Sequence, residues 1–172
     1  MVNVAGVMGD SIVDGPGIRV AIFVQGCCHH CEGCHNPESW AFGAGTDMSV
    51  EELFAMVKAN PLCRGVTFSG GEPFCQAGAL VPLAENLKAA GYELASYSGY
   101  TFEQLLAGTP EQKALLGLLD ILVDGPFVLA QRNLDLLFRG SANQRILDVP
   151  KSLAAGSAVW CTAPRWVGEK QG

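Results

Sequence analysis

The segment of residues 26–36, GCCHHCEGCHN, concentrates the metal-binding side chains of this chain. It holds four of the seven cysteines, and Cys27, Cys31 and Cys34 have the spacing C-x3-C-x2-C. Cys28 is adjacent to Cys27, so the two thiols cannot easily face the same ligand. Because a thiolate is both a metal ligand and a redox-active group, the segment predicts a metal centre or a redox site.

Zinc and plain thiols are two of the three chemistries that this segment allows. A structural zinc ion takes four ligands, usually from two separated pairs, and no second pair follows Cys31 and Cys34. One of the three nearby histidines would have to complete the site from within a tight loop. Disulfides or buried thiols are the better interpretation for the isolated Cys63, Cys75 and Cys161, since an unbridged cysteine packs like a small hydrophobic residue.

The third chemistry is an iron–sulfur cluster. A four-iron cluster normally takes four thiolates, so three thiolates from one loop leave one iron open to a small molecule. Gly26 and Gly33 allow the backbone to curl until the three sulfurs converge. No Ser-His-Asp arrangement or pair of carboxylates stands out elsewhere, and we assign no catalytic side chain.

Strand and helix patterns alternate along the chain. Strands are predicted at residues 19–24, 66–69, 92–97, 121–123, 145–149 and 158–161. Helices are predicted at residues 49–60, 76–90, 102–107, 111–119 and 151–155, with Ser49 and Thr101 as N-caps. The alternation predicts an α/β fold with a mainly parallel sheet, either doubly wound or part of a barrel.

Polar or glycine-rich stretches follow the first four predicted strands. After the cysteine segment come Gly70–Glu72, Ser98–Gly99 and Asp124–Gly125. In parallel α/β sheets, the loops at the carboxyl ends of the strands form the functional site. We therefore expect these four stretches to meet at one edge of the sheet.

Composition limits the partners and the compartment. The chain has 172 residues, of which 49% are hydrophobic and 16% charged, and its net charge is −6. This composition excludes a disordered chain, and we expect a single domain over residues 1–172. The acidic balance argues against a nucleic acid or an anionic membrane as partner, and no apolar run approaches the ~18 residues of a membrane span. The N-terminus lacks a signal-peptide pattern, so we expect a cytoplasmic protein.

Two motifs together resemble the radical S-adenosylmethionine (SAM) enzymes. They are the C-x3-C-x2-C segment after the first strand and Ser69-Gly70-Gly71-Glu72-Pro73 after the second. Other stretches resemble the activating enzymes of glycyl-radical enzymes, above all the anaerobic ribonucleoside-triphosphate reductase activating proteins. These are DGPGIR at 14–19, CHN at 34–36 with Trp40 after it, YSGYT at 97–101, VDGPF at 123–127 and FRGSANQR at 138–145. The resemblance implies an incomplete (β/α) barrel of about five or six mainly parallel strands.

The resemblance also implies a set of ligands. Cys27, Cys31 and Cys34 would hold a [4Fe-4S] cluster, and SAM would chelate the open iron through its amino and carboxylate groups. The residues implied to bind SAM are Gly33, Cys34, His35, Asn36, Gly70, Gly71 and Glu72. At Glu72, a carboxylate or carbonyl would accept hydrogen bonds from the SAM ammonium. Gly33 departs from the family, because many radical SAM enzymes carry an aromatic residue there; the ring of His35 can supply a flat surface instead.

The implied activity is the generation of a glycyl radical on another protein. Reductive cleavage of SAM would give methionine and a 5′-deoxyadenosyl radical, which takes a hydrogen atom from a glycine Cα. The implied partners are the large subunit of anaerobic ribonucleotide reductase and a one-electron donor such as flavodoxin or ferredoxin. Three alternatives remain open: activation of another glycyl-radical enzyme such as pyruvate formate-lyase, a non-catalytic zinc or redox module, and radical chemistry on a small molecule.

Overall fold

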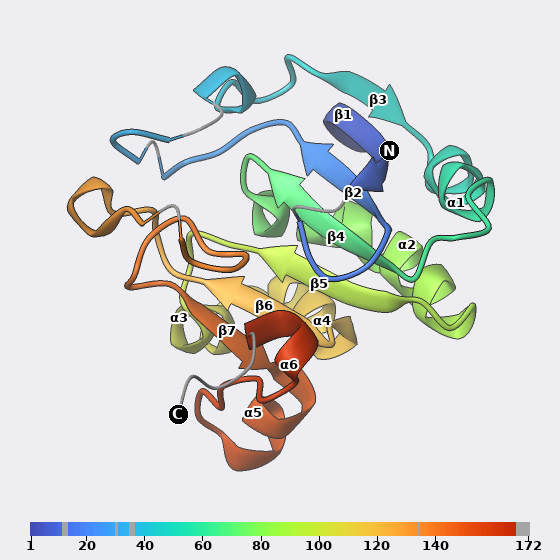
Figure 1. The fold of residues 1–172 in the computed structure, drawn as a ribbon. Coiled ribbons are helices and arrows are strands. Elements are labelled where there is room, and N and C mark those ends of the chain that lie inside the picture. The colour runs from blue at the N-terminus through green and yellow to red at the C-terminus, as the bar shows by residue number, and fades with distance from the viewer. Residues whose placement is uncertain (12–13, 30, 35–36, 134, 168–172) are drawn as a thin grey trace.

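The computed structural model describes residues 1–11, 14–29, 31–34, 37–133 and 135–167. One seven-stranded sheet runs through the molecule in the order β3-β1-β2-β4-β5-β6-β7 (Figure 1). The strands are β1 (Val2–Ser11), β2 (Arg19–Val24), β3 (Thr46–Met48), β4 (Gly65–Gly70), β5 (Glu93–Tyr97), β6 (Ile121–Asp124) and β7 (Arg145–Asp148). The four central strands β2, β4, β5 and β6 are parallel, whereas β1 pairs antiparallel with β2 and β3, and β7 with β6. The prediction of a mainly parallel α/β sheet is thus confirmed.

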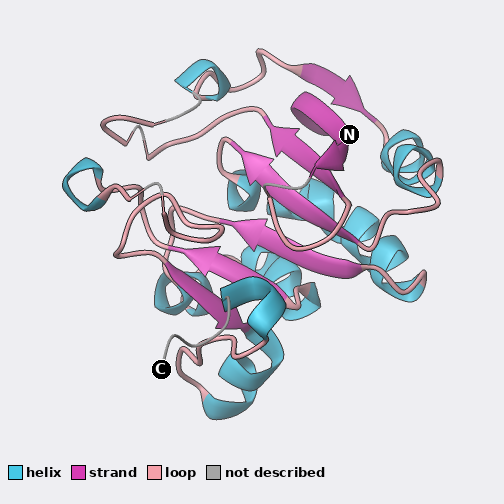
Figure 2. Ribbon diagram, viewed as in Figure 1, coloured by secondary structure: helices cyan, strands magenta, loops and turns pink. Residues whose placement is uncertain are grey.

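Helices connect the strands and cover the sheet (Figure 2). They are α1 (Val50–Lys58), α2 (Ala77–Ala89), α3 (Phe102–Leu106), α4 (Pro110–Leu118), α5 (Val149–Ala155) and α6 (Pro164–Val167), with 3-10 turns η1 (Pro37–Ser39), η2 (Pro73–Gln76) and η3 (Leu129–Gln131). Ser49 and Thr101 cap α1 and α3 as predicted, each accepting a backbone N–H three residues further on. None of the helices in the described part of the chain combines the length and the apolar composition needed to cross a bilayer.

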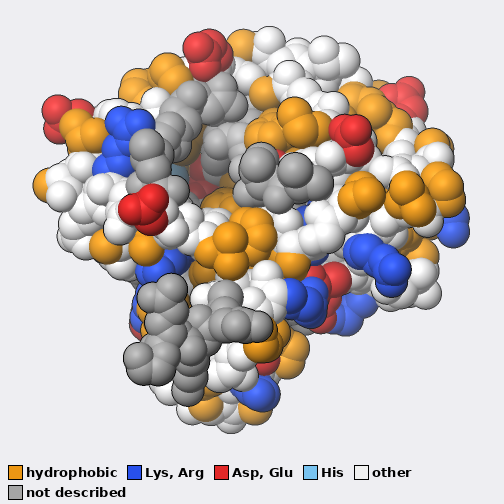
Figure 3. Space-filling view, viewed as in Figure 1, with side chains coloured by type: hydrophobic (Ala, Val, Ile, Leu, Met, Phe, Trp, Pro, Cys, Tyr) orange, Lys and Arg blue, Asp and Glu red, His pale blue; other side chains and the backbone are white. Residues whose placement is uncertain are grey.

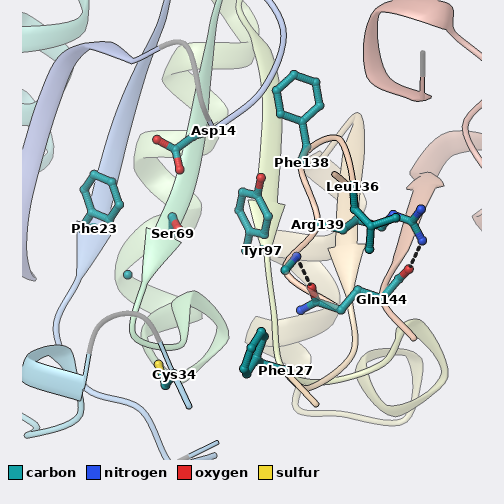
Figure 4. Close-up of a pocket in the computed structure, with 12 residues that line it drawn as sticks. Asp14, Phe23, Cys34, Ser69, Tyr97, Phe127, Leu136, Phe138, Arg139 and Gln144 are labelled. Carbon is teal, nitrogen blue, oxygen red and sulfur yellow. Dashed lines mark hydrogen bonds between the residues drawn. The ribbon is translucent and has the colours of Figure 1, made fainter. Parts of the chain in front are cut away.

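The two faces of the central strands have different surroundings, because successive side chains point to opposite faces of a sheet. Ile22 and Val24 of β2 are buried in the main hydrophobic core, together with residues of α1, α2, α3 and α4. Phe23, between them, lines a cavity with Ser69 of β4 and Tyr97 of β5 (Figure 4). One face of the sheet is therefore packed against helices α1 to α4, and the other borders this cavity and a smaller hydrophobic cluster around Trp166.

The sheet departs from the sequence prediction at both edges. Neither β1 nor β3 is predicted, since β1 contains two glycines and β3 spans only three residues, so both lack a strong strand pattern. The prediction at residues 158–161 is wrong as a strand, because that segment makes one isolated bridge between Leu147 and Trp160. The sheet has seven strands rather than five or six, and β3 and β7 are its two open edges.

A buried ionic network closes the amino ends of the central strands. Arg19 is 1% exposed and donates to Thr67 Oγ1 (2.9 Å) and Glu93 Oε1 (3.0 Å). Glu93 also accepts a hydrogen bond from Trp166 Nε1 (3.2 Å) and forms an ion pair with Arg165, both of α6. These contacts tie α6 to the amino end of β5, and Trp166 packs with Ala95 of β5 and Val123 of β6.

This network predicts an acid-sensitive contribution to stability. Burial alone would raise the pKa of Glu93, but the hydrogen bonds from Arg165 and Arg19 outweigh it and lower the pKa below its ordinary value of 4.5. The stabilisation by the Glu93 carboxylate is therefore complete above about pH 4.5 and is lost as the pH falls through the folded pKa. We expect Glu93→Gln to lower the free energy of unfolding by about 1–3 kcal/mol at pH 7, as measured by urea denaturation. The difference from wild type should shrink below pH 4; a difference that grows in acid would contradict the assignment.

Candidate functional site

The loops that carry the predicted motifs meet at the carboxyl edge of the sheet. In Figure 1 the arrows of β2, β4, β5 and β6 point to the same side of the molecule, where the loop after β2 and the loop between β6 and β7 lie. The four stretches expected at this edge all begin at the ends of these strands. The topology therefore confirms that they share one edge.

Three of the four clustered cysteines line one small cavity. Cys27, Cys31 and Cys34 border a cavity of about 130 Å³, which Gly70 and Gly71 border from the end of β4. Among the described cysteines, Cys28 does not line this cavity but approaches Cys75 and Tyr100 instead. The structure thus separates Cys28 from the three cysteines of the C-x3-C-x2-C spacing.

Two glycines allow the backbone to approach this cavity closely. Gly70 has a φ of +94°, a conformation that side chains rarely adopt, and a Cβ there would lie 2.7 Å from the backbone nitrogen of Val24. A Cβ on Gly71 would overlap the backbone oxygen of Gly26. The Gly-Gly pair is therefore required by the close packing of the β4 turn against the start of the cysteine loop.

A larger cavity of about 440 Å³ adjoins the first, and the two share Cys34, Gly70 and Tyr97 in their walls. Figure 4 shows Ser69 and Tyr97 rising from neighbouring strands, with Phe127 and Phe138 from the β6–β7 loop on the other side. In the space-filling view, this face of the molecule is visibly hollowed (Figure 3). The larger cavity has aromatic walls and a few polar groups, as expected for a small-molecule site.

Two polar groups of the larger cavity have defined electrostatic properties. Burial raises the pKa of the Tyr97 phenol, and the negative charge of Asp14 raises it further, so the phenol stays protonated and can donate. Burial lowers the pKa of Arg139, whose Nη1 donates to the Gln144 backbone oxygen (2.9 Å). The Arg139 Nε is buried and has no hydrogen-bond partner in the structure described. The Arg139 guanidinium is turned away from the cavity (Figure 4) and lies 5.3 Å from the centroid of the Trp160 ring.

Glu72 is fully buried at the junction of three loops and lines neither cavity. Its Oε1 accepts from His29 Nε2 (2.7 Å), Ser98 Oγ (2.8 Å) and the Gly99 backbone nitrogen (2.7 Å). Its Oε2 accepts from the Phe74 backbone nitrogen (2.9 Å). In this structure the carboxylate is occupied by four internal donors, and it fixes the cysteine loop relative to the loop after β5.

From the sequence, His29 is expected to be an exposed loop residue rather than a metal ligand, but its side chain is only 16% exposed and contacts Glu72. His29 also packs edge-on against Tyr100, with ring centroids 4.6 Å apart, and its ring occupies the space beside Gly99. A buried carboxylate needs donors, and a glycine beside a strand end leaves room for a ring. Neither the burial of Glu72 nor the space beside Gly99 is visible in the sequence, because only the fold brings residues 29, 72 and 99 together.

Gly99→Ala tests this packing. The new Cβ would overlap the His29 ring, so the ring must leave its place between Tyr100 and Glu72. We expect a loss of about 1–3 kcal/mol in the free energy of unfolding, because a buried hydrogen bond is broken. Urea denaturation measures the loss, and Gly117→Ala is the control, since a Cβ at Gly117 meets nothing within 4 Å. Equal stability of the two variants would contradict the packing.

The remaining predicted site residues have different positions. Gly33 lies in the cysteine loop with a φ of +75°, and a Cβ there would lie 2.7 Å from Leu129 Cδ1. His35 and Asn36 lie outside the described residues. Asp124 caps α3 through the Phe102 nitrogen (2.7 Å) and binds Arg145, so its contacts are structural.

No three Cys, His, Asp or Glu side chains in the described ranges converge on one point as ligands of a single metal ion. The shared cavity of three cysteines instead has the donor set that suits a cluster, in which each thiolate binds a different iron. The residues present therefore fit a [4Fe-4S] group.

Comparison with known proteins agrees with this geometry. Residues 13–147 match the model of a family described as "4Fe-4S single cluster domain". The anaerobic ribonucleoside-triphosphate reductase-activating proteins of Haemophilus influenzae and Vibrio cholerae are 34% and 36% identical over 143 residues. Each alignment covers 78% of this chain and 90% of the relative. This chain belongs to the family of anaerobic ribonucleoside-triphosphate reductase-activating proteins.

Two other similarities are more limited. A pyruvate formate-lyase-activating enzyme of Listeria monocytogenes is 44% identical to this member of the activating-protein family over 84 residues, 46% of this chain and 34% of the relative. The crystal structure of QueE from Escherichia coli superposes with a TM-score of 0.46 and 22% identity, over 58% of this chain and 53% of that one. As a family member, the chain is an activating enzyme of the radical SAM type, with a [4Fe-4S] cluster and SAM as cofactors.

Proposed function

We propose that this chain activates the large subunit of an anaerobic ribonucleotide reductase by forming a glycyl radical on it. One observation carries the proposal: Cys27, Cys31 and Cys34 line a cavity that opens into a larger, aromatic-walled cavity at the carboxyl edge of the sheet. The bound cluster and SAM together supply the one-electron cleavage of SAM that yields methionine and a carbon radical. The protein's own residues bind, orient and shield these groups.

The three cysteines hold the cluster in this proposal, and their loop is fixed from two sides. The Gly70–Gly71 turn packs against the start of the loop. The His29–Glu72 contact fixes the middle of the loop. We infer that these supports set the position of the open iron relative to the larger cavity, because a ligand loop is oriented by its surrounding contacts.

SAM occupies the larger cavity in this proposal. Gly70 and Cys34 line both cavities, and Gly71 lines the smaller one, so these residues offer backbone where the two cavities meet. Gly33, His35 and Asn36 stay in the proposal as the further SAM contacts that the resemblance implies. Tyr97 lines both cavities, and its protonated phenol is the donor that the wall offers to a bound ligand. Glu72 contributes by holding His29, Ser98 and Gly99 in place, because its carboxylate already accepts four hydrogen bonds.

In this proposal, residues 1–172 form one radical SAM domain. The sheet is the partial (β/α) barrel of that domain. Its two open edges suit a substrate glycine that enters on a loop of another protein. Exposed thiols such as Cys28 and Cys75 suit a reducing compartment, so we place the reaction in the cytoplasm. A small one-electron donor such as flavodoxin or ferredoxin would supply the electron.

A partner comparison tests the proposal. The iron-loaded protein is mixed anaerobically with SAM, a chemical one-electron reductant and either anaerobic ribonucleotide reductase or pyruvate formate-lyase. Electron paramagnetic resonance (EPR) then detects the glycyl radical. We expect a radical on the reductase, and none when SAM is omitted. A radical on pyruvate formate-lyase alone would contradict the choice of partner.

Pyruvate formate-lyase is the second candidate partner because one of its activating enzymes matches 84 residues of this chain. That match covers only 34% of the longer enzyme, whereas the reductase-activating relatives are matched over 90% of their length. The length of the match therefore favours the reductase.

A further inference from the structure

A pair of thiols lies beside the cysteine loop but outside the cluster cavity. Cys28 Sγ is 3.9 Å from Cys75 Sγ, although the two residues are 47 positions apart. Both residues are exposed, and neither thiol is in a disulfide. Cys28 Sγ also lies 3.2 Å from the Tyr100 hydroxyl. The C-x3-C-x2-C motif does not include either cysteine, and the proposed function assigns neither of them a role in binding the cluster or SAM.

The geometry allows a disulfide after a small movement. A disulfide needs the sulfurs to approach to about 2.0 Å, so the pair has roughly 2 Å to close. Cys28 follows β2 in the cysteine loop, and Cys75 lies in η2, which begins directly after Glu72. Cys75 also lines an open groove of about 450 Å³ with Phe42, Phe74 and Gly78. A small reagent can therefore reach Cys75 from this groove, and Cys28 is itself exposed, so neither approach passes through the cluster cavity.

We propose that Cys28 and Cys75 form a redox-active dithiol site whose reactant is a low-molecular-weight disulfide of the glutathione class. One thiolate attacks the reagent's S–S bond, forms a mixed disulfide and releases the first small thiol. The second cysteine then attacks the protein sulfur of the mixed disulfide and displaces the second small thiol. The two cysteines lose two electrons and two protons, and the reagent gains both as two thiols.

Because the two sulfurs lie 3.9 Å apart, a mixed disulfide on either cysteine is within reach of the other thiol after a small movement. The product ties the cysteine loop to η2 by a covalent bond, next to the Glu72 contact that already holds them. The site is a reversible modification point on the loop that the proposed function assigns to the cluster.

Peptide mapping of the iron-loaded protein tests the proposal. Anaerobic protein is treated with oxidised glutathione, alkylated, digested without reductant and analysed by mass spectrometry. We expect a cross-link between Cys28 and Cys75 that dithiothreitol reverses. In Cys75→Ser the reaction should stop at a glutathione adduct on Cys28, and in Cys28→Ser no cross-link from Cys75 should form.

Cys63→Ser is the matched control. The Cys63 thiol donates to the Gly65 backbone oxygen (3.1 Å), at the amino end of β4, and this variant should cross-link like wild type. A cross-link from Cys75 that persists in Cys28→Ser, or stable glutathione adducts without any cross-link in wild type, would overturn the proposal. The readout needs neither SAM nor a partner enzyme, so it is independent of the test of the proposed function.

Discussion

Replacing any one of Cys27, Cys31 and Cys34 by alanine is expected to abolish cluster binding. Each thiolate holds one iron in our assignment, and the three cysteines share one cavity. A cluster that keeps only two protein thiolates has too few ligands to remain bound. Iron and acid-labile sulfide, measured after anaerobic reconstitution, should fall from about four per chain in wild type to near zero in each variant.

Cys28→Ala is the matched control for these variants. Cys28 belongs to the same loop, but its thiol faces Cys75 and Tyr100. The Cys28→Ala variant should retain iron and sulfide at the wild-type level. Loss of iron in Cys28→Ala, with retention in Cys27→Ala, would show that the ligand assignment is wrong by one residue.

Glu72→Ala is expected to cause a large loss of stability. The substitution removes the acceptor of four hydrogen bonds at a fully buried position. Each buried donor left without a partner costs about 1–3 kcal/mol, less where water can enter. We therefore expect the free energy of unfolding of the cluster-free protein to fall by about 3–5 kcal/mol, as measured by urea denaturation.

Two further variants separate this effect from a general loss of charge. Glu85 is exposed on α2, and Glu85→Ala should change the stability by less than about 0.5 kcal/mol. Glu72→Gln keeps one acceptor oxygen but turns an amide N–H toward internal donors. Its loss in free energy of unfolding should therefore lie between those of Glu72→Ala and Glu85→Ala. A urea midpoint for Glu72→Ala equal to that of Glu85→Ala would show that the buried network contributes nothing.

The central part of the fold could be predicted from the sequence because its signals are local. β2, β4, β5 and β6 are short apolar runs that end at glycine or polar residues, and the helices between them have clear N-caps such as Ser49 and Thr101. The edges could not be predicted, because β1 and β3 depend on pairing with their neighbours rather than on their own composition. The parallel arrangement of these strands was enough to predict that the motif-bearing loops meet at one edge, and this prediction needed no information on side-chain contacts.

The site could be predicted only as far as its local motifs extend. The cysteine spacing and the Gly-Gly turn were visible, and the structure gives a steric reason for Gly71. The bond between His29 and Glu72 joins residues 43 positions apart, and the pairing of Cys28 with Cys75 joins residues 47 apart. Such contacts depend on how two loops pack, and no pattern within either loop indicates them.

The most direct test of the account is EPR spectroscopy of the reduced, iron-loaded protein before and after addition of SAM. The account places an open iron at the boundary between the cavity of Cys27, Cys31 and Cys34 and the larger cavity. It predicts a four-iron signal whose shape changes when SAM binds. A cluster signal that is indifferent to SAM, or stoichiometric zinc without sulfide, would contradict the account.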